Sequence, residues 1–308
     1  MRMTPKEARK IPKALWVVTI VFAVLANVSE ELLQAGNTGL FISSAIAAFV
    51  VYKVTLWADA YEHETRQSLI FTGIFGCGVS VLLAIFLFEL IPGSSDSNFV
   101  VAVIEESSKA LVLLPLIWLR YINSWTDGLV FGSMAGLGFS ITEDFMYAIG
   151  SEDPLVTIIG REIYSIFGHS VFSAFLFAAI CAAHLNSRKS IFLVMLTLSI
   201  GTHWSWNSGV GLIEGGQFIV YAVIPPVTFV LLAVFLRAQE KSELKLLGKK
   251  SIELGLLTAE ELDLAANLKQ RKRYRRKLDT SAQKEEFDNK ISADVRKILG
   301  TIKTQSSS

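Results

Sequence analysis

Three ionisable residues stand in an otherwise apolar stretch of the sequence, VIEESSKALVLLP, at residues 103–115. In a helix, Glu105 and Lys109 share a face, whereas Glu106 is rotated by about 100° from Glu105. One lysine can neutralise one glutamate well, so the second carboxylate needs another partner, a proton or a metal ion. Charges in an apolar span usually face a protein interior or a water-filled cavity. The stretch therefore predicts a buried polar site.

A further carboxylate, Glu143, follows a ridge of small residues in a later apolar segment. Gly128, Gly132 and Gly136 are spaced four apart, which allows another helix to approach closely. Glu143 lies about two helical turns beyond this ridge, so we expect its carboxylate to enter a helix interface and not lipid. Asp144 points about 100° away, and we expect it to have a structural role.

The next two apolar segments each carry a polar stripe with one histidine. The stripes are Ser165, His169 and Ser173, and Ser199, His203 and Asn207. A single histidine in a membrane helix commonly makes a hydrogen bond between helices, and this alternative stays open for each histidine taken alone.

Carboxylates, imidazoles and a side-chain amide are the groups that activation of water requires. A carboxylate can act as the base, a histidine as the proton shuttle, and an amide as a donor to an oxyanion. The serines near the histidines lie on the same stripes and lack a separate acid, so we recognise no nucleophilic triad. Hydrolysis by activated water is therefore preferred over acyl-enzyme chemistry.

Composition places these residues in a membrane protein. The chain has 308 residues, 52% of them hydrophobic, and a mean hydropathy of +0.47, far from a soluble globular composition. Apolar runs of about 20 residues can cross a bilayer as helices. We predict eight, at residues 14–33, 39–58, 69–91, 99–120, 128–149, 161–184, 191–213 and 217–236. The expected fold is all-α, a polytopic bundle of about eight transmembrane helices with a soluble helical C-terminal tail.

Depth in the membrane brings the polar residues to one level. At 1.5 Å per residue, six of them lie about 9 to 15 Å from the outer ends of their predicted helices. These are Glu105, Glu106, Glu143, His169, His203 and Asn207. We predict that they share one polar pocket, which opens towards the outer side of the membrane.

Loop charges predict the orientation, because Lys and Arg in short loops stay on the cytoplasmic side. Cations precede the first span, namely Arg2, Lys6, Arg9, Lys10 and Lys13. Arg161 is the only cation near the opposite face, whose loops carry acids such as Glu30, Glu31 and Glu214. We therefore expect a multi-pass protein of the cell membrane with both termini in the cytoplasm. A cleaved signal peptide in place of the first span would leave seven spans in the same orientation.

Charge divides the chain into a basic N-terminus at residues 1–13, a membrane domain at 14–236 and a cytoplasmic tail at 237–308. The tail has 17 Lys and Arg against 11 Asp and Glu, a net charge of +6, whereas the rest has 12 against 17, a net charge of −5. Thr258 and Glu261 have the spacing of a capping box at the start of a helix. Seven cations lie in KQRKRYRRK, residues 269–277. Anionic lipid headgroups are the expected partner of this run, and nucleic acid is less favoured because an aromatic platform is lacking.

Short motifs occur along the chain in a recognisable order. They are EExxK at Glu105–Lys109, FxxxE at Phe139–Glu143, a histidine at His169 and HxxxN at His203–Asn207. In this order they resemble the PrsW family of intramembrane proteases and, more distantly, the CAAX prenyl proteases of the abortive-infection type. The resemblance covers roughly residues 99–213.

This resemblance implies cleavage of a membrane-anchored protein or peptide, such as the first cut of an anti-sigma factor on its extracytoplasmic side. It implies that Glu105 is the general base, assisted by Glu106. It also implies that His203 and Asn207 stabilise the tetrahedral intermediate. Lys109 would support the reaction by offsetting the charge of the glutamate pair.

Two departures separate this chain from the CAAX relatives. Glu143 stands where they have a histidine, and Lys109 replaces an arginine and comes one position earlier. These departures argue against a CAAX substrate and leave His169 as the replacement for the missing imidazole.

Metal dependence stays open. Glu106, or Glu105, together with His169 and His203 could form a zinc site with three protein ligands and an open position for water. No two histidines share a helix at ligand spacing, so such a site would have to be assembled from three helices. Metal-free activation of water is the alternative.

Two further classes of function also keep ionisable residues inside the membrane. A proton-coupled transporter would do so, but it would be expected to show inverted repeats and helices broken near the middle of the membrane. A non-catalytic scaffold whose basic tail recruits a partner is the other alternative.

Overall fold

The computed structural model describes residues 10–27, 38–61, 64–122, 124–186, 189–210 and 217–301. Every regular element in these ranges is a helix, so the predicted all-α class is confirmed for them. Some residues used above lie outside the described ranges, namely Arg2, Lys6, Arg9, Glu30, Glu31 and Glu214.

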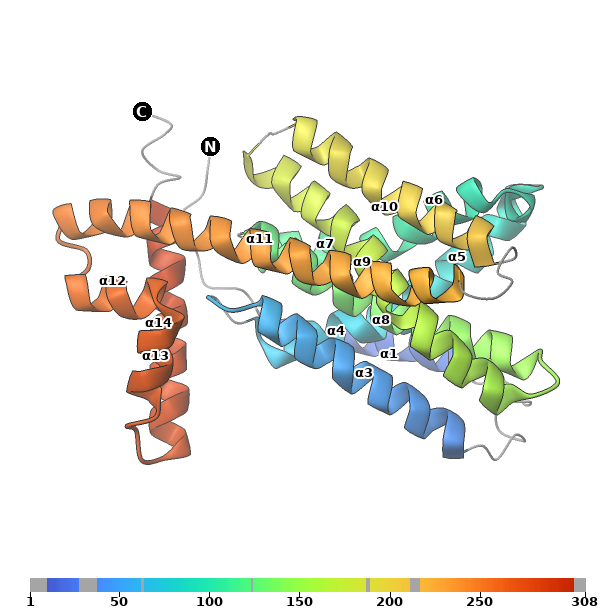
Figure 1. Ribbon diagram of the computed structural model, residues 1–308, viewed down its shortest axis with the longest axis horizontal. Coiled ribbons are helices and arrows are strands. Elements are labelled where there is room, and N and C mark those ends of the chain that lie inside the picture. Colours follow the sequence, from blue (N-terminus) through green and yellow to red (C-terminus); the bar gives the residue numbers. More distant parts are fainter. Residues whose placement is uncertain are drawn as a thin grey trace.

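The helices surround a central pair, α8 and α9, and Figure 1 shows α10 and α3 on opposite sides of the bundle. The N-terminal helices are α1 (Lys13–Asn27), α3 (Thr38–Ala58), α4 (Arg66–Phe75), the π-helix η1 (Gly76–Ser80), α5 (Val81–Leu90) and the 3₁₀ turn η2 (Ser94–Asp96). The middle of the chain forms α6 (Asn98–Ala110), α7 (Leu113–Trp118), α8 (Trp125–Ile149), α9 (Pro154–Asn186) and α10 (Lys189–Val210). The C-terminal part forms α11 (Gln217–Glu253), α12 (Ala259–Ala266), α13 (Leu268–Arg275) and α14 (Ser281–Thr301).

Three helical stretches among the described residues are long and apolar enough to cross a membrane. They are Arg66–Leu90, Phe167–Leu185 and Val223–Glu253. Shorter apolar stretches lie at Lys13–Ala26 and Ile42–Ala58. The structure thus agrees with a helical membrane protein, whereas the eight predicted spans are confirmed only in part.

The predicted fourth span is not one continuous helix in the structure. α6 ends at Ala110, and α7 begins at Leu113. Pro115 explains the interruption. Its ring would clash with the carbonyl of Leu111, four residues earlier in a regular helix, and its nitrogen carries no hydrogen that could bond to that carbonyl. The interruption follows Lys109, so the glutamate pair and the lysine remain on one regular helix.

The predicted glycine ridge on α8 packs directly against the backbone of α9. A Cβ atom at Gly132 would lie 2.4 Å from the carbonyl oxygen of Ser173. One at Gly136 would lie 2.2 Å from the carbonyl oxygen of His169. The expected close approach of another helix is therefore confirmed, and it brings the histidine of α9 beside α8.

Replacement of Gly132 by alanine should destabilise the fold, by about 1–3 kcal/mol, because the new methyl group would overlap the α9 backbone. Gly201→Ala is the matched control, since a Cβ atom at Gly201 meets nothing within 4 Å. Alanine favours a helix more than glycine does, so the control should be neutral or slightly stabilising. Unfolding in detergent measures both variants, and equal stability of Gly132→Ala and the parent protein would contradict the predicted packing.

The opposite face of α8 packs against α4 and η1. A Cβ atom at Gly138 would lie 1.9 Å from the carbonyl oxygen of Gly73. Thr142 donates a hydrogen bond of 2.8 Å from Oγ1 to the carbonyl oxygen of Cys77. α8 is therefore held on two sides, which fixes the direction in which Glu143 projects.

The C-terminal helices form a separate apolar cluster beyond one end of the bundle, as Figure 1 shows. α11 is continuous through Arg237, where the sequence placed the start of the tail, and its second half packs against α12 and α14. Leu244, Val295 and Ile298 are fully buried in this cluster. The predicted capping box at Thr258 opens α12 and is confirmed.

Candidate active site

Four helices bring the predicted polar residues together. α6 carries Glu105, Glu106 and Lys109, α8 carries Glu143, α9 carries His169, and α10 carries His203 and Asn207. α6 packs against α8, α9 and α10, so its polar face points into the space that these helices enclose. All of these residues except Asn207 join one network of polar contacts.

Lys109 lies at the centre of the network and is fully buried. Its Nζ atom lies 2.7 Å from Oε1 of Glu106 and 3.6 Å from Oε2 of Glu105. The same atom lies 3.0 Å from Nδ1 of His169 and 4.0 Å from the ring centroid of Phe139. Of the two glutamates, Lys109 therefore pairs mainly with Glu106.

Glu106 has hydrogen-bond partners on both carboxylate oxygens. Oε1 accepts from Lys109 and lies 3.0 Å from Nδ1 of His203. Oε2 accepts a hydrogen bond of 2.8 Å from the hydroxyl of Ser173. With its acceptor sites engaged, Glu106 is suited to hold the lysine and His203 in place.

Glu105 is held less tightly than its neighbour. Its Oε2 atom is buried and, within the described ranges, has no hydrogen-bond partner. Nε2 of His203 is also buried and has no hydrogen-bond partner in these ranges, and the two atoms lie 3.5 Å apart. Because Nδ1 of His203 donates to Glu106, the neutral ring carries a lone pair on Nε2, which faces the Glu105 carboxylate. Two acceptors that face each other need a proton, a water molecule or a cation between them.

His169 has partners on both ring nitrogens. An ammonium group can only donate, so Nδ1 accepts from Lys109, and the proton of the neutral ring lies on Nε2. This Nε2 atom lies 2.8 Å from Oε2 of Glu143 and donates to it. The expectation that Glu143 enters a helix interface is therefore confirmed.

Arg161 joins the network, although the sequence analysis used it only as the one cation near the outer face. Its Nη2 atom lies 3.1 Å from Oε2 of Glu143, and its Nε atom lies 2.6 Å from Oδ1 of Asp144. The sequence did carry a signal for this contact. Two consecutive acids lie at the outer end of one predicted span, and a cation lies at the start of the next.

Asn207 lies one turn after His203 in α10 and is half-buried. In the described part of the chain its amide has no polar partner, so Asn207 stands outside the network. Phe172 stacks on the His203 ring, with the centroids 4.8 Å apart, and fixes the plane of that ring. Ser165 lies in α9, but its side chain is outside the described part of the structure.

Three side chains of the network could hold a metal ion. One donor atom from each of Glu105, His169 and His203 lies within 4.8 Å of the other two. Oε2 of Glu105 and Nε2 of His203, which are buried and have no hydrogen-bond partner among the described residues, fit this use. His169 would have to give up its contact with Lys109 or with Glu143, depending on which ring nitrogen binds the ion. The structure thus favours Glu105 over Glu106 as the carboxylate ligand, because the oxygens of Glu106 are already engaged.

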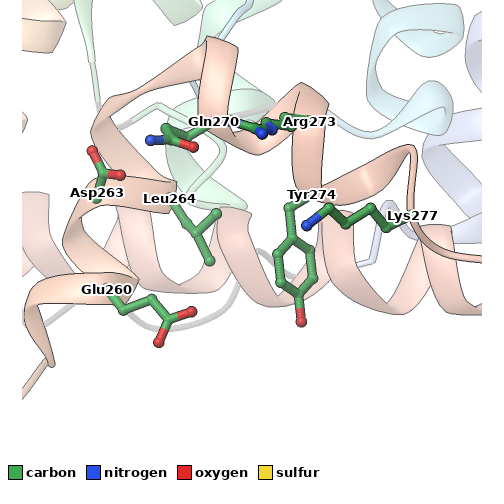
Figure 2. Close-up of a pocket in the computed structure, with 7 residues that line it drawn as sticks. All are labelled: Glu260, Asp263, Leu264, Gln270, Arg273, Tyr274 and Lys277. Carbon is green, nitrogen blue, oxygen red and sulfur yellow. The ribbon is translucent and has the colours of Figure 1, made fainter.

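A hollow lies in the C-terminal helices, between α12 and α13. Figure 2 shows its lining, with Glu260 and Asp263 from α12 and Arg273 and Lys277 from α13 and the residues just after it. This hollow has no histidine among its lining residues and lies in the tail, far from the network described above.

Buried carboxylates and imidazoles lie together between the helices of an apolar bundle, as hydrolysis by activated water inside a membrane requires. The model of a protein family, the PrsW family intramembrane metalloproteases, matches residues 64–235, which include all four helices of the network. The chain belongs to this family and is therefore a peptidase of the membrane. No curated protein and no solved structure shows significant similarity to it.

Proposed function

We propose that this peptidase hydrolyses its substrate with water that Glu105 activates. The observation that carries the proposal is a pair of buried atoms, Oε2 of Glu105 and Nε2 of His203, which lie 3.5 Å apart and have no hydrogen-bond partner among the described residues. A water molecule between them would donate one hydrogen to each atom and would keep its oxygen lone pairs for attack on a carbonyl carbon.

The remaining residues support this arrangement. Lys109 and Glu106 hold the base and His203 in position through the contacts described above. The proton that Glu105 takes from water can pass to Nε2 of His203, which then donates to the oxyanion of the tetrahedral intermediate, and it ends on the amine nitrogen that leaves when the C–N bond breaks. The Asn207 amide lies one turn further along α10 and is free to serve as a second donor when substrate is bound.

A zinc ion is the other means of activation that the donor atoms support. Glu105, His169 and His203 would be its protein ligands, which leaves a position for water. Bound zinc supplies a water molecule that loses its proton near neutral pH. In that case Lys109 and Glu106 keep their roles, since neither is needed as a ligand.

The proposed substrate is a membrane-anchored protein or peptide that is cut on the extracytoplasmic side, for example an anti-sigma factor. Glu143 and Arg161 support this side, because their side chains are 20% and 24% exposed, whereas Glu106 and Lys109 are fully buried. Both exposed residues lie towards the α8–α9 connection, which the loop charges place outside the cell. We retain the proposed topology of eight spans with both termini in the cytoplasm.

We also propose that the basic run of the tail lies beside anionic lipid headgroups. The buried guanidinium of Arg271 donates to the carbonyl oxygens of Ala60 and Tyr61, at 3.2 and 3.1 Å. These carbonyls come shortly after α3, which is one of the proposed spans, and this supports a position of α13 beside the membrane surface. The neighbouring cations Lys272 and Arg276 are exposed and remain available to phosphate groups.

Mapping of new protein termini in cells tests the function. Cells that express the wild type or Glu105→Gln are compared by mass spectrometry of membranes and medium. New termini that appear only with the wild type, at the outer edge of a membrane span of another protein, are the expected result and would identify the substrate. Identical termini with both well-expressed proteins under several envelope stresses would contradict the proposal and favour transport, which ion flux in liposomes measures.

A further inference from the structure

Arg161 bridges two consecutive carboxylates of α8 with one guanidinium group. Nε binds Asp144, and Nη2 binds Glu143, at 2.6 and 3.1 Å. Successive residues of a helix point about 100° apart, so a group that reaches both must present donors in two directions. The planar fork of arginine does this, whereas the ammonium of lysine is a single point charge.

The guanidinium is itself held from two other sides. It lies over the ring of Tyr147, 3.8 Å from the centroid. Its partner Asp144 is buried and accepts a second hydrogen bond, of 3.1 Å, from Ser140. Arg161 is therefore fixed by Tyr147 and Asp144, and it presents Nη2 to Glu143.

The oxygen that Arg161 binds on Glu143 is the one that accepts from His169. Oε2 of Glu143 lies 3.1 Å from Nη2 of Arg161 and 2.8 Å from Nε2 of His169. The negative charge of this carboxylate lies inside the helix bundle and needs a nearby cation. Lys109 already serves Glu105 and Glu106 at the other side of His169. Arg161 thus supplies the second cation of the network and fixes the acceptor that orients His169.

A purely structural role, holding α8 against α9, does not account for this geometry. The glycine ridge already brings the two helices into backbone contact, and Gly136 touches the backbone of α9 at His169. The ion pairs at Arg161 lie beyond this contact, on the side where Glu143 is partly exposed. The contacts of Arg161 therefore serve the polar network around Glu143 more than the packing of α8 against α9.

We infer that Arg161 is a positioning residue of the peptidase, which acts through Glu143 to set the orientation of His169. This inference rests on the proposed function. Because Arg161 acts through Glu143, its removal should lower kcat and leave KM within about twofold, as expected for a group that orients the reacting residues without binding the substrate. The expected loss in kcat for Arg161→Gln is about 10- to 100-fold.

A double-mutant cycle with the purified full-length protein tests the inference. The substrate is a reporter that carries the membrane span recovered by terminus mapping, and the variants are Arg161→Gln, Glu143→Gln and both together. If Arg161 acts through Glu143, the double variant should be no slower than Glu143→Gln alone. Losses that multiply in the double variant, or an unchanged kcat in Arg161→Gln, would overturn the inference. Arg161→Lys should restore part of the activity, since it keeps the charge but not the fork.

Two controls separate this inference from the proposed function and from misfolding. Glu105→Gln is measured with the same reporter, and if it cleaves at the wild-type rate, the proposed function fails whatever Arg161 does. If Glu105→Gln is inactive and Arg161→Gln is fully active, only the inference about Arg161 fails. Should Arg161→Gln not fold, the cycle is run with Arg161→Lys, whose smaller loss in kcat must likewise vanish in the Glu143→Gln background.

Discussion

Glu105→Gln should reduce kcat of the purified protein by about 100- to 10,000-fold, the range that loss of a general base produces. Glutamine has nearly the same shape and volume, so the fold should be retained, but its amide cannot take a proton from water. Cleavage of a membrane-anchored reporter in detergent or liposomes measures the effect. Glu89→Gln makes the same chemical change at an exposed position of α5 and should leave kcat unchanged.

The metal content of the same preparations distinguishes the two means of activation. If Glu105 is a zinc ligand, the wild type should retain about one zinc per chain, and Glu105→Gln and His203→Gln should both lose it. If Glu105 acts as a base without metal, none of these proteins should contain stoichiometric zinc, and a chelator should leave activity intact. Full cleavage by Glu105→Gln would exclude both roles for this residue.

Lys109→Met should destabilise the fold by about 3–5 kcal/mol, because it leaves a buried carboxylate without its cation. The lysine is fully buried and lies 2.7 Å from Glu106, whose own side chain is also inaccessible. Methionine fills a similar volume, so the loss should reflect charge and not a cavity. Unfolding in detergent is the measurement.

A second substitution checks the cause of that loss. Adding Glu106→Gln to Lys109→Met removes the unpaired charge and should recover part of the stability, which a double-mutant cycle quantifies. Lys53→Met is the matched control, since Lys53 is exposed on α3 and its removal should change stability by less than about 0.5 kcal/mol. A Lys109→Met protein as stable as the wild type would show that Glu106 is not ionised in the folded state.

The sequence by itself determined the class of fold and the membership of the site. Apolar runs separated by charged loops are typical of membrane helices, and residue spacing along a helix predicts depth to within a few ångströms. Those two regularities were sufficient to bring Glu105, Glu106, Glu143, His169 and His203 together, and the structure places all five in one network. The glycine ridge could also be predicted, because small residues at spacing four commonly allow membrane helices to pack closely.

Only the tertiary structure decided how these residues are connected. Hydrogen bonds depend on distances of about 3 Å and on the rotation of each helix about its axis, which spacing along one helix does not specify. For this reason the sequence left open which glutamate Lys109 neutralises, and packing assigned Glu106. The sequence also did not predict the contact between Arg161 and Glu143, which forms because α9 packs against α8. Contacts between helices, not patterns within them, leave Oε2 of Glu105 and Nε2 of His203 without a hydrogen-bond partner in the described part of the chain, and the proposed chemistry depends on these two atoms.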